Sequence, residues 1–132
     1  MACVIQKPTL LATALVLRGL QGTGKNQFIE YFGRIFGPYF LTVTNLDHLI
    51  GKFNSHLKYA YLINANEAIW AGNKKKVGAL KALITDRTII IEGKGKDAIP
   101  VDNCRHLIVS SNEDCAVPMD LDDRRFFVLD VS

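Results

Sequence analysis

The chain has 132 residues, of which 48% are hydrophobic and 22% charged, and its formal net charge is +3. This length suits one domain with its own core and is too short for two, and the weak positive charge neither requires nor excludes nucleic acid as a partner. Three cysteines without C-x-x-C spacing and three histidines without zinc-ligand spacing argue against a zinc site and a disulfide framework. The apolar run near the N-terminus is ended by Arg18, far short of the roughly 20 residues that a membrane span requires. We therefore expect a cytoplasmic protein of one domain, residues 1–132, in a reducing compartment and without a membrane partner.

In chain order, short apolar runs alternate with segments of helical periodicity, which is typical of a parallel sheet covered by helices. The predicted strands are residues 14–17, 39–44, 59–64, 106–110 and 126–131, and the predicted helices are residues 25–36, 46–53 and 74–85. Residues 88–92 and 98–101 flank the glycine-rich basic segment 93–97, and this pattern predicts a β-hairpin before the fourth strand. The sequence thus predicts an α/β fold of three layers, with a five-stranded, mostly parallel sheet and a hairpin insertion.

The segment between the first strand and the first helix, residues 19–26, reads Gly-Leu-Gln-Gly-Thr-Gly-Lys-Asn and fits the phosphate-loop pattern G-x-x-x-x-G-K. Its glycines allow the backbone to turn so that several N–H groups point at one anion, while the helix N-terminus and Lys25 add positive potential. The next position departs from the pattern, because Asn26 stands where a Ser or Thr hydroxyl normally reaches Mg²⁺. A glycine-rich turn without a ligand is the alternative interpretation. The predicted nucleotide-binding residues are Gly19, Gly22, Thr23, Gly24, Lys25 and Asn26.

Two polar residues, Asn66 and Glu67, follow the third predicted strand. The carboxyl ends of parallel strands face the phosphate crevice, and phosphate-loop NTPases usually carry two acidic residues there, one for hydrated Mg²⁺ and one for the attacking water. Glu67 is therefore the predicted catalytic base. Asn26, Asn66 and Glu67 are the predicted Mg²⁺ contacts, partly through water. A surface glutamate after a buried strand is the alternative for Glu67.

Polar and charged residues also flank the fourth and fifth strands. Asn112 follows the fourth strand at the same edge, where an uncharged donor would orient water against the terminal phosphate. Arg124 and Arg125 precede the last strand at the opposite edge, from which an arginine reaches a nucleotide on a neighbouring subunit more readily than its own. Local ion pairing of these arginines with nearby aspartates is an equally good interpretation.

Taken together, these motifs resemble those of the superfamily 3 helicases within the AAA+ class, especially the primase-associated helicase domains of phages, plasmids and large DNA viruses. The resemblance covers residues 15–132 and is carried by the segments 19–26, 66–72, 80–85 and 123–126. It implies a P-loop NTPase core of the AAA+ type with ATP and Mg²⁺ as cofactors. It also implies a homo-oligomeric ring, a hexamer, that moves on single-stranded DNA during replication of a mobile element. Because complete replication helicases carry further domains, we expect the chain to be the motor core of a larger primase-helicase.

The resemblance also assigns roles to residues. The catalytic residues that it implies, as phosphate ligand, base, sensor and candidate arginine fingers, are Lys25, Glu67, Asn112, Arg124 and Arg125. Lys94 and Lys96, at the hairpin tip, would hold phosphate oxygens of single-stranded DNA without reading its sequence. Outside this family, a solvated hairpin tip would be the favoured interpretation of the two lysines.

Functions of two other classes stay open. A small nucleotide kinase would share the phosphate loop, but it needs an acceptor pocket and an arginine-bearing lid that the sequence does not show. A module that binds NTP and DNA to assemble a ring without turnover would follow if Asn26 and Asn66 weaken the metal site. The preferred hypothesis is that Mg²⁺ is positioned through the phosphates, water and Glu67, so that the chain is an ATPase, with weak turnover in isolation allowed for.

Overall fold

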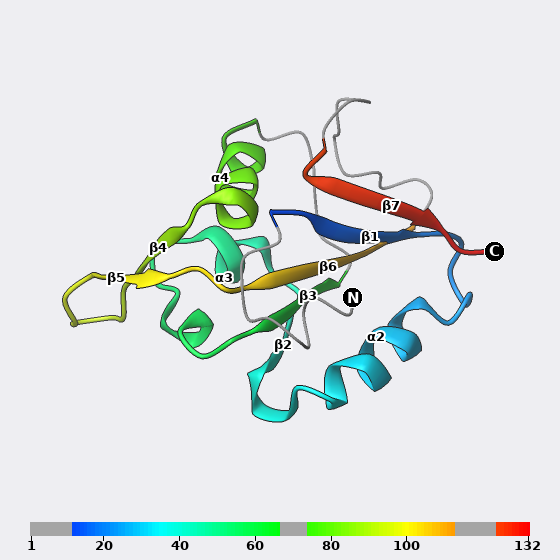
Figure 1. Cartoon of the computed structure of the whole chain (residues 1–132), viewed down its shortest axis with the longest axis horizontal. Helices are drawn as coiled ribbons and strands as arrows, with labels where there is room; N and C mark the ends of the chain where they lie inside the picture. Colours follow the sequence, from blue (N-terminus) through cyan, green and yellow to red (C-terminus); the bar gives the residue numbers. More distant parts are fainter. Residues whose placement is uncertain (1–11, 67–73, 113–123) are drawn as a thin grey trace.

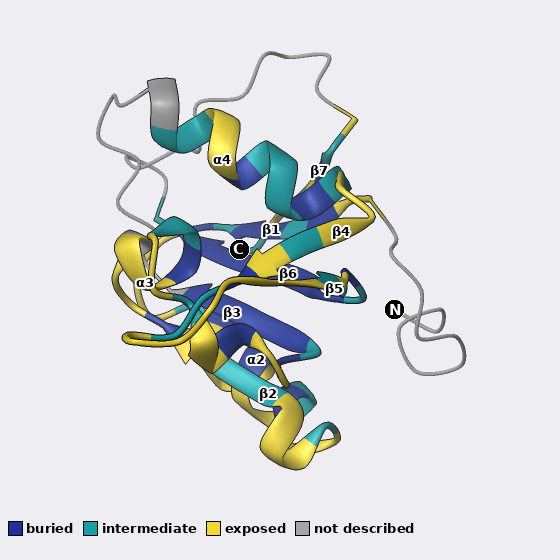
Figure 2. Ribbon diagram, turned by 90° about the vertical axis from the view of Figure 1, so that its left-hand side faces the viewer, coloured by how far each residue is buried: buried dark blue, intermediate teal, exposed yellow. Residues whose placement is uncertain are grey.

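The computed structural model describes residues 12–66, 74–112 and 124–132 and shows a five-stranded sheet with helices on both faces (Figure 1, Figure 2). The order of the strands is β2-β3-β6-β1-β7, and each pairing is parallel. The predicted α/β fold with five strands in one sheet is confirmed. The strands are β1 (Ala14–Arg18), β2 (Phe40–Val43), β3 (Leu62–Asn66), β6 (His106–Ser111) and β7 (Phe126–Asp130).

The helices divide the core into two layers. One helix, α2, covers one face of the sheet, where Ile29 packs with Leu17 and Leu62. The helices α3 and α4 cover the other face, where Leu49 and Leu80 contribute to a second core. None of the helices in the described residues has the length and apolar character that crossing a bilayer demands. The helices are α2 (Lys25–Arg34), α3 (Leu46–Ile50) and α4 (Lys74–Thr85), with 3-10 helices η1 (Gly37–Tyr39) and η2 (Ser55–Leu57).

The third predicted strand is wrong at both ends. It begins at Leu62 rather than at residue 59, because the chain after η2 continues in a turn in which the Ala60 N–H donates to the Leu57 carbonyl (3.2 Å). The strand then runs on to Asn66 instead of ending at residue 64. The shift brings Asn66 into the sheet.

The first two predicted helices are too long. The helix α2 ends at Arg34 rather than at residue 36, and Gly37, with a φ of 54°, begins the η1 turn together with Pro38. The helix α3 ends at Ile50 rather than at residue 53, where the Gly51 N–H donates to the Asp47 carbonyl (2.8 Å). Both errors come from apolar residues that continue a helical pattern past a glycine.

The strands β4 (Thr88–Ile91) and β5 (Ile99–Asp102) form a separate antiparallel pair, which confirms the predicted hairpin before the fourth strand of the main sheet. At its tip the Lys96 N–H donates to the Gly93 carbonyl (3.1 Å), and Gly95 has a φ of 73°. In Figure 1 the hairpin extends away from the sheet on the side opposite to the start of α2.

Two buried polar residues, Asn103 and Arg105, hold the base of the hairpin against the core. The Asn103 Nδ2 donates to the carbonyls of Leu83 and Asp86 (2.8 Å each), at the end of α4. The Asn103 Oδ1 accepts from the Arg105 N–H (3.2 Å). The segment that leads from β5 to β6 is therefore tied to α4 by one side chain.

The guanidinium of Arg105 makes a second set of contacts. It donates to the carbonyls of Leu57 (2.8 Å), Lys58 (2.9 Å) and Asp102 (3.1 Å). Burial lowers the pKa of Arg105, but a guanidinium stays charged in proteins, so these carbonyls bind a cation. One side chain thus joins the η2 turn to the end of β5.

His106, at the start of β6, is buried with its ring 4.9 Å from that of Tyr61, and neither ring nitrogen has a hydrogen-bond partner among the described residues. Burial lowers the pKa of His106 below its ordinary value of 6.5. The folded state therefore resists protonation, whereas the unfolded chain takes up a proton as the pH falls through about 6.5. Between about pH 7.5 and about pH 5.5, we expect the wild type to lose about 1 kcal/mol more of its free energy of unfolding than His106→Phe loses.

Urea denaturation of both proteins at the two pH values measures this difference. His48 and His56 are present in both proteins, so they do not contribute to the difference between them. An equal dependence on pH in the two proteins would contradict the expectation.

The strand β7 pairs with β1 and forms one edge of the sheet. Phe126 is buried, whereas Phe127 and Leu129 are 57% and 43% exposed. The helix α2 packs against β2, β3 and β6, so it lies toward the other edge. In the described part of the chain, these two apolar side chains of β7 are therefore left without a helix over them.

Candidate functional site

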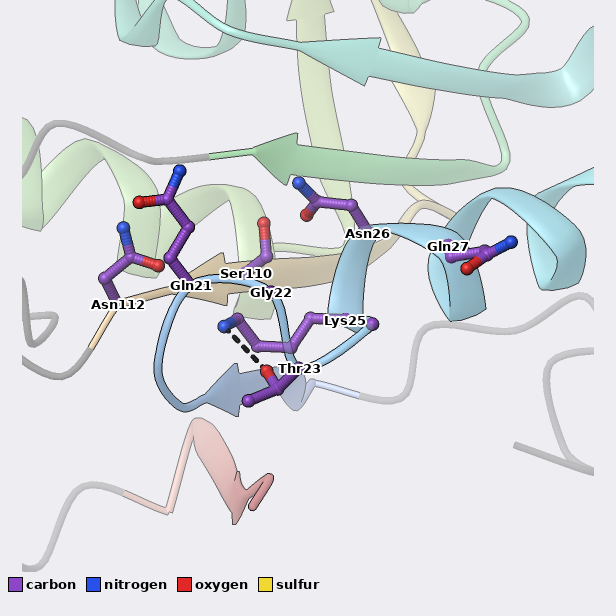
Figure 3. Close-up of a pocket in the computed structure, with 9 residues that line it drawn as sticks. Gln21, Gly22, Thr23, Lys25, Asn26, Gln27, Ser110 and Asn112 are labelled. Carbon is purple, nitrogen blue, oxygen red and sulfur yellow. Dashed lines mark hydrogen bonds between the residues drawn. The ribbon is translucent and has the colours of Figure 1, made fainter.

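A pocket of about 320 Å³ lies at the carboxyl edge of the sheet, where β1 and β6 end (Figure 3). It is lined by residues 21–27, which connect β1 to α2, and by Ser110 and Asn112 of the β6 end. The chain leaving β1 leads to β2 on one side, and the chain leaving β6 leads to β7 on the other. Such a reversal in an open parallel sheet is the usual place for a ligand.

The loop before α2 owes its shape to two glycines. Gly22 and Gly24 have φ values of 85° and 82°, in the left-handed region that other residues rarely adopt. Gly24 is the N-cap residue of α2, and the first helical bond runs from the Phe28 N–H to the Gly24 carbonyl (3.0 Å). The N–H groups of residues 25–27 therefore have no carbonyl partner within the helix, and they lie where the helix dipole is positive. This end of α2 favours an anion.

Lys25 is only 7% exposed, and its ammonium lies within the loop. Its Nζ donates to the carbonyls of Gly19 (2.6 Å) and Leu20 (2.7 Å) and to the hydroxyl of Thr23 (3.1 Å). No carboxylate is among the described residues that line the pocket. An ammonium bound to neutral oxygens keeps its full charge, so it strengthens the preference of the pocket for an anion.

Gly19, a predicted nucleotide-binding residue, is not among the described residues that line the pocket. It is buried, and a Cβ at this position would lie 2.2 Å from the carbonyl oxygen of Val131. A glycine is therefore needed at this position because the backbone packs closely against the end of the chain after β7. The carbonyl of Gly19 also accepts a hydrogen bond from Lys25.

The residues from β6 form the opposite wall of the pocket. Ser110 is 2% exposed and Asn112 is half-buried. In the view of Figure 3, the Asn112 amide lies beside that of Gln21, and the Ser110 hydroxyl oxygen lies between the amides of Gln21 and Asn26. The sequence led to Asn112 but not to Gln21, Gln27 or Ser110. The period of two along a strand is the signal for Ser110, because it stands two residues before Asn112.

The end of β3 lies next to this wall. Its last residue, Asn66, is in register with Ser110, so the backbone brings the predicted metal contact to the edge of the pocket. Glu67, the predicted base, lies outside the described residues. Asn64 is 2% exposed, and its Oδ1 has no hydrogen-bond partner within the described part of the chain. An unpaired buried amide oxygen costs about 1–3 kcal/mol, so the asparagine at this position does not favour the fold.

Among the described residues that line the pocket, the oxygen donors available for a metal ion are neutral. Thr23, Asn26 and Ser110 offer hydroxyl and amide oxygens, and no group of three or more His, Cys, Asp or Glu suited to a metal occurs among the described residues. Magnesium in proteins usually keeps several waters and binds one or two carboxylates together with phosphates of a substrate. The described residues thus suit Mg²⁺ that arrives with phosphates better than they suit the free ion.

The predicted arginine fingers lie far from the pocket. Arg124 is exposed and Arg125 is half-buried, and the Arg125 carbonyl accepts from the N–H of Ala14, the first residue of β1 (2.7 Å). The two arginines are therefore at the amino edge of the sheet, whereas the pocket is at the carboxyl edge. Lys94 and Lys96 are exposed at the hairpin tip.

The fold and the pocket define a class of parallel α/β protein in which a glycine-rich loop and a buried lysine follow a central strand. Within this class, the chain belongs to a family of unknown function, DUF5906, whose model matches residues 17–125. The matched region includes every described residue that lines the pocket.

Similarity to a phage replication protein accompanies this assignment. The DNA primase-polymerase of Nitratiruptor phage NrS-1 is 29% identical over 136 residues, which cover 98% of this chain and 18% of that protein. Two apo structures of the NrS-1 C-terminal region match with TM-scores of 0.85 and 0.83, at 30% and 26% identity. Each match covers 98% of this chain, and the matches cover 32% and 31% of those chains. The chain therefore spans less than a fifth of the curated relative, and it corresponds to part of the C-terminal region.

Proposed function

We propose that this chain is the nucleotide-driven motor of a phage-type replication protein, which binds ATP in the pocket and uses its hydrolysis to move along single-stranded DNA. The observation that carries the proposal is the ammonium of Lys25 inside a glycine loop, in a pocket that Asn112 also lines at the carboxyl edge of the sheet. The similarity to the C-terminal region of a phage DNA primase-polymerase supports a role in DNA replication.

Different residues at the pocket have different roles in the proposed reaction. The N–H groups of residues 25–27 and the Lys25 ammonium bind the phosphates, for which Lys25 exchanges a carbonyl partner for a phosphate oxygen. Asn112 orients the attacking water, and Glu67 takes its proton. Mg²⁺, when bound with the nucleotide, neutralises charge that develops on the phosphates. The metal contacts come from Asn26, Asn66 and Glu67, partly through water.

The arginines complete the site of a neighbour in this proposal. Because Arg124 and Arg125 stand at the amino edge of the sheet, they serve a nucleotide bound by the next subunit of a ring, of which a hexamer is the expected form. Such a shared site predicts that two inactive variants restore activity when they are mixed, since a mixed interface combines an intact pocket with an intact arginine.

The test measures phosphate release from ATP with and without single-stranded DNA, while light scattering reports size. The Lys25→Ala protein and each of Arg124→Ala and Arg125→Ala are assayed alone and in equal mixtures. Regained activity in one mixture identifies the finger. A protein that stays monomeric with ATP and DNA and shows no recovery in either mixture would refute the ring.

The hairpin lysines are expected to contribute to DNA binding through phosphate contacts. For single strands, each such contact adds about 0.7 to the slope of log affinity against log salt, so Lys94→Ala with Lys96→Ala should reduce that slope by about 1.4. Fluorescence anisotropy with a labelled oligonucleotide over a salt series measures it. Lys58→Ala, an exposed lysine outside the hairpin, is the matched control and should leave the slope unchanged. An unchanged slope in the double variant would show that the hairpin lysines do not contact the phosphates of DNA.

A nucleotide-binding module without turnover is the second candidate. It is favoured by the neutral character of the described residues that line the pocket, since a weakly held metal slows hydrolysis more than binding. Tight binding of ATP and assembly of a ring, without phosphate release in the presence of DNA, would select this function over the motor.

A further inference from the structure

The loop offers no hydroxyl at the position after its lysine. Asn26 occupies that place, exposed in the first turn of α2. Asn26 can offer its amide oxygen to the metal, but a carboxamide is longer than a hydroxyl, so we expect this contact to go through water. A magnesium ion bound with ATP therefore gains from a protein hydroxyl supplied by another element.

Thr23, which also lines the pocket, is engaged in the loop itself. Its hydroxyl donates to the Leu20 carbonyl (2.9 Å) and accepts from the Lys25 ammonium (3.1 Å). A move of this hydroxyl toward a metal would release both bonds and loosen the turn that holds Lys25. The Thr23 hydroxyl therefore stabilises the conformation of the loop.

Ser110 is placed at the centre of the site by the sheet. It is in register with Leu17 of β1 on one side and with Asn66 of β3 on the other, so it stands between the strand that leads into the loop and the strand that leads to Glu67. Its hydroxyl lies on the pocket side in Figure 3, facing the region of Asn26. Since β6 is hydrogen-bonded on both sides and buried throughout, the position of this side chain is fixed by the fold.

We propose that the Ser110 hydroxyl binds the Mg²⁺ of the bound nucleotide, in place of the hydroxyl that position 26 lacks. The proposal rests on the proposed function, because the metal comes with ATP. The Ser110 Oγ gives one lone pair to the metal and keeps its O–H as a donor, so no proton is lost. In this arrangement, the neighbouring strand adds a direct hydroxyl contact to the metal, beside the contacts of Asn26, Asn66 and Glu67 that go partly through water. The phosphate contacts come from the loop.

The experiment measures the affinity of the full chain for a fluorescent ATP analogue, first with EDTA and then over a Mg²⁺ titration. Mg²⁺ is expected to change the affinity for the ATP analogue, and the Mg²⁺ concentration that gives half of this change is the quantity compared. In Ser110→Ala we expect that concentration to rise about tenfold or more, with the affinity for the analogue in EDTA unchanged. Adding Asn26→Ser to Ser110→Ala should restore the wild-type titration. Ser111→Ala is the matched control, because Ser111 is also buried but donates to the Asn112 carbonyl (3.0 Å) and does not line the pocket.

The outcomes separate this inference from the proposed function. If the wild type binds the nucleotide and responds to Mg²⁺ but Ser110→Ala responds equally, the inference fails and the proposed function stands. If the wild type does not bind the nucleotide under any condition, both fail. Should circular dichroism show that Ser110→Ala is unfolded, Ser110→Cys decides the question. A thiol ligand should shift the preference from Mg²⁺ to Cd²⁺, and an unchanged preference would overturn the inference.

Discussion

Replacement of Lys25 by methionine is expected to weaken the binding of ATP about 100-fold without unfolding the protein. Methionine keeps the apolar stem but removes the ammonium, whose charge-assisted hydrogen bonds to phosphate are worth about 3 kcal/mol, or a factor of roughly 100 in affinity. The variant also removes the donor from the carbonyl of Gly19, in a buried contact, and from that of Leu20, in a part-buried one, so its folding is checked separately. Equilibrium binding of a fluorescent ATP analogue with Mg²⁺ measures the loss.

An exposed lysine provides the control for this variant. Lys52 has a side chain that is 73% exposed and lies 3.9 Å from Glu92, so Lys52→Met should change the affinity less than twofold. Circular dichroism checks that both variants are folded. A Lys25→Met protein that is folded and binds ATP as the wild type does would mean that the loop is not the phosphate site.

Replacement of Arg105 by alanine is expected to lower the free energy of unfolding by about 4 kcal/mol, because three hydrogen bonds from a charged donor are lost together. The carbonyls of Leu57, Lys58 and Asp102 would be left without this donor in a region that is partly or fully buried. The same change releases the η2 turn from the base of the hairpin. Urea denaturation followed by circular dichroism measures the effect.

Two further variants sharpen this test. Arg87→Ala removes an exposed arginine from the start of the hairpin and should cost less than about 0.5 kcal/mol. Arg105→Lys keeps the charge but not the planar fork, so it should recover only a minor part of the loss. A loss below about 1 kcal/mol in Arg105→Ala would show that water or relaxation satisfies the three carbonyls.

The sheet and the loop could be predicted because their signals are local. The apolar run of β1, the glycine spacing of residues 19–26 and the apolar run before Ser110 each lie within a few residues. The order of the strands has no such signal, since β1 pairs with β6 and β7 across most of the chain. The error in β3 has the same origin, because an aromatic stretch typical of a strand begins in a turn fixed by η2.

The pocket likewise contains residues that have a local sequence signal and residues whose place is set by the fold. Lys25 and Asn112 follow from motif and strand end. For Ser110 the only sequence signal is the period of two along its strand, and its place between Leu17 and Asn66 comes from the register. Arg105 has no sequence signal, because an arginine between two strands normally reads as a surface charge. Its partner Leu57 is 48 positions away, and only the fold brings the two together.

The exposed edge of β7 bears on how this chain behaves at high concentration. Among the described residues no strand pairs with the outer side of β7, where Phe127 and Leu129 are exposed. Such an edge is the part of a sheet most prone to pair with another chain. Self-association through this edge would rise with protein concentration whether or not nucleotide is present, and two such edges that pair would form a dimer. Species that form only with ATP, and that are larger than a dimer, are therefore the ones to assign to an ordered ring.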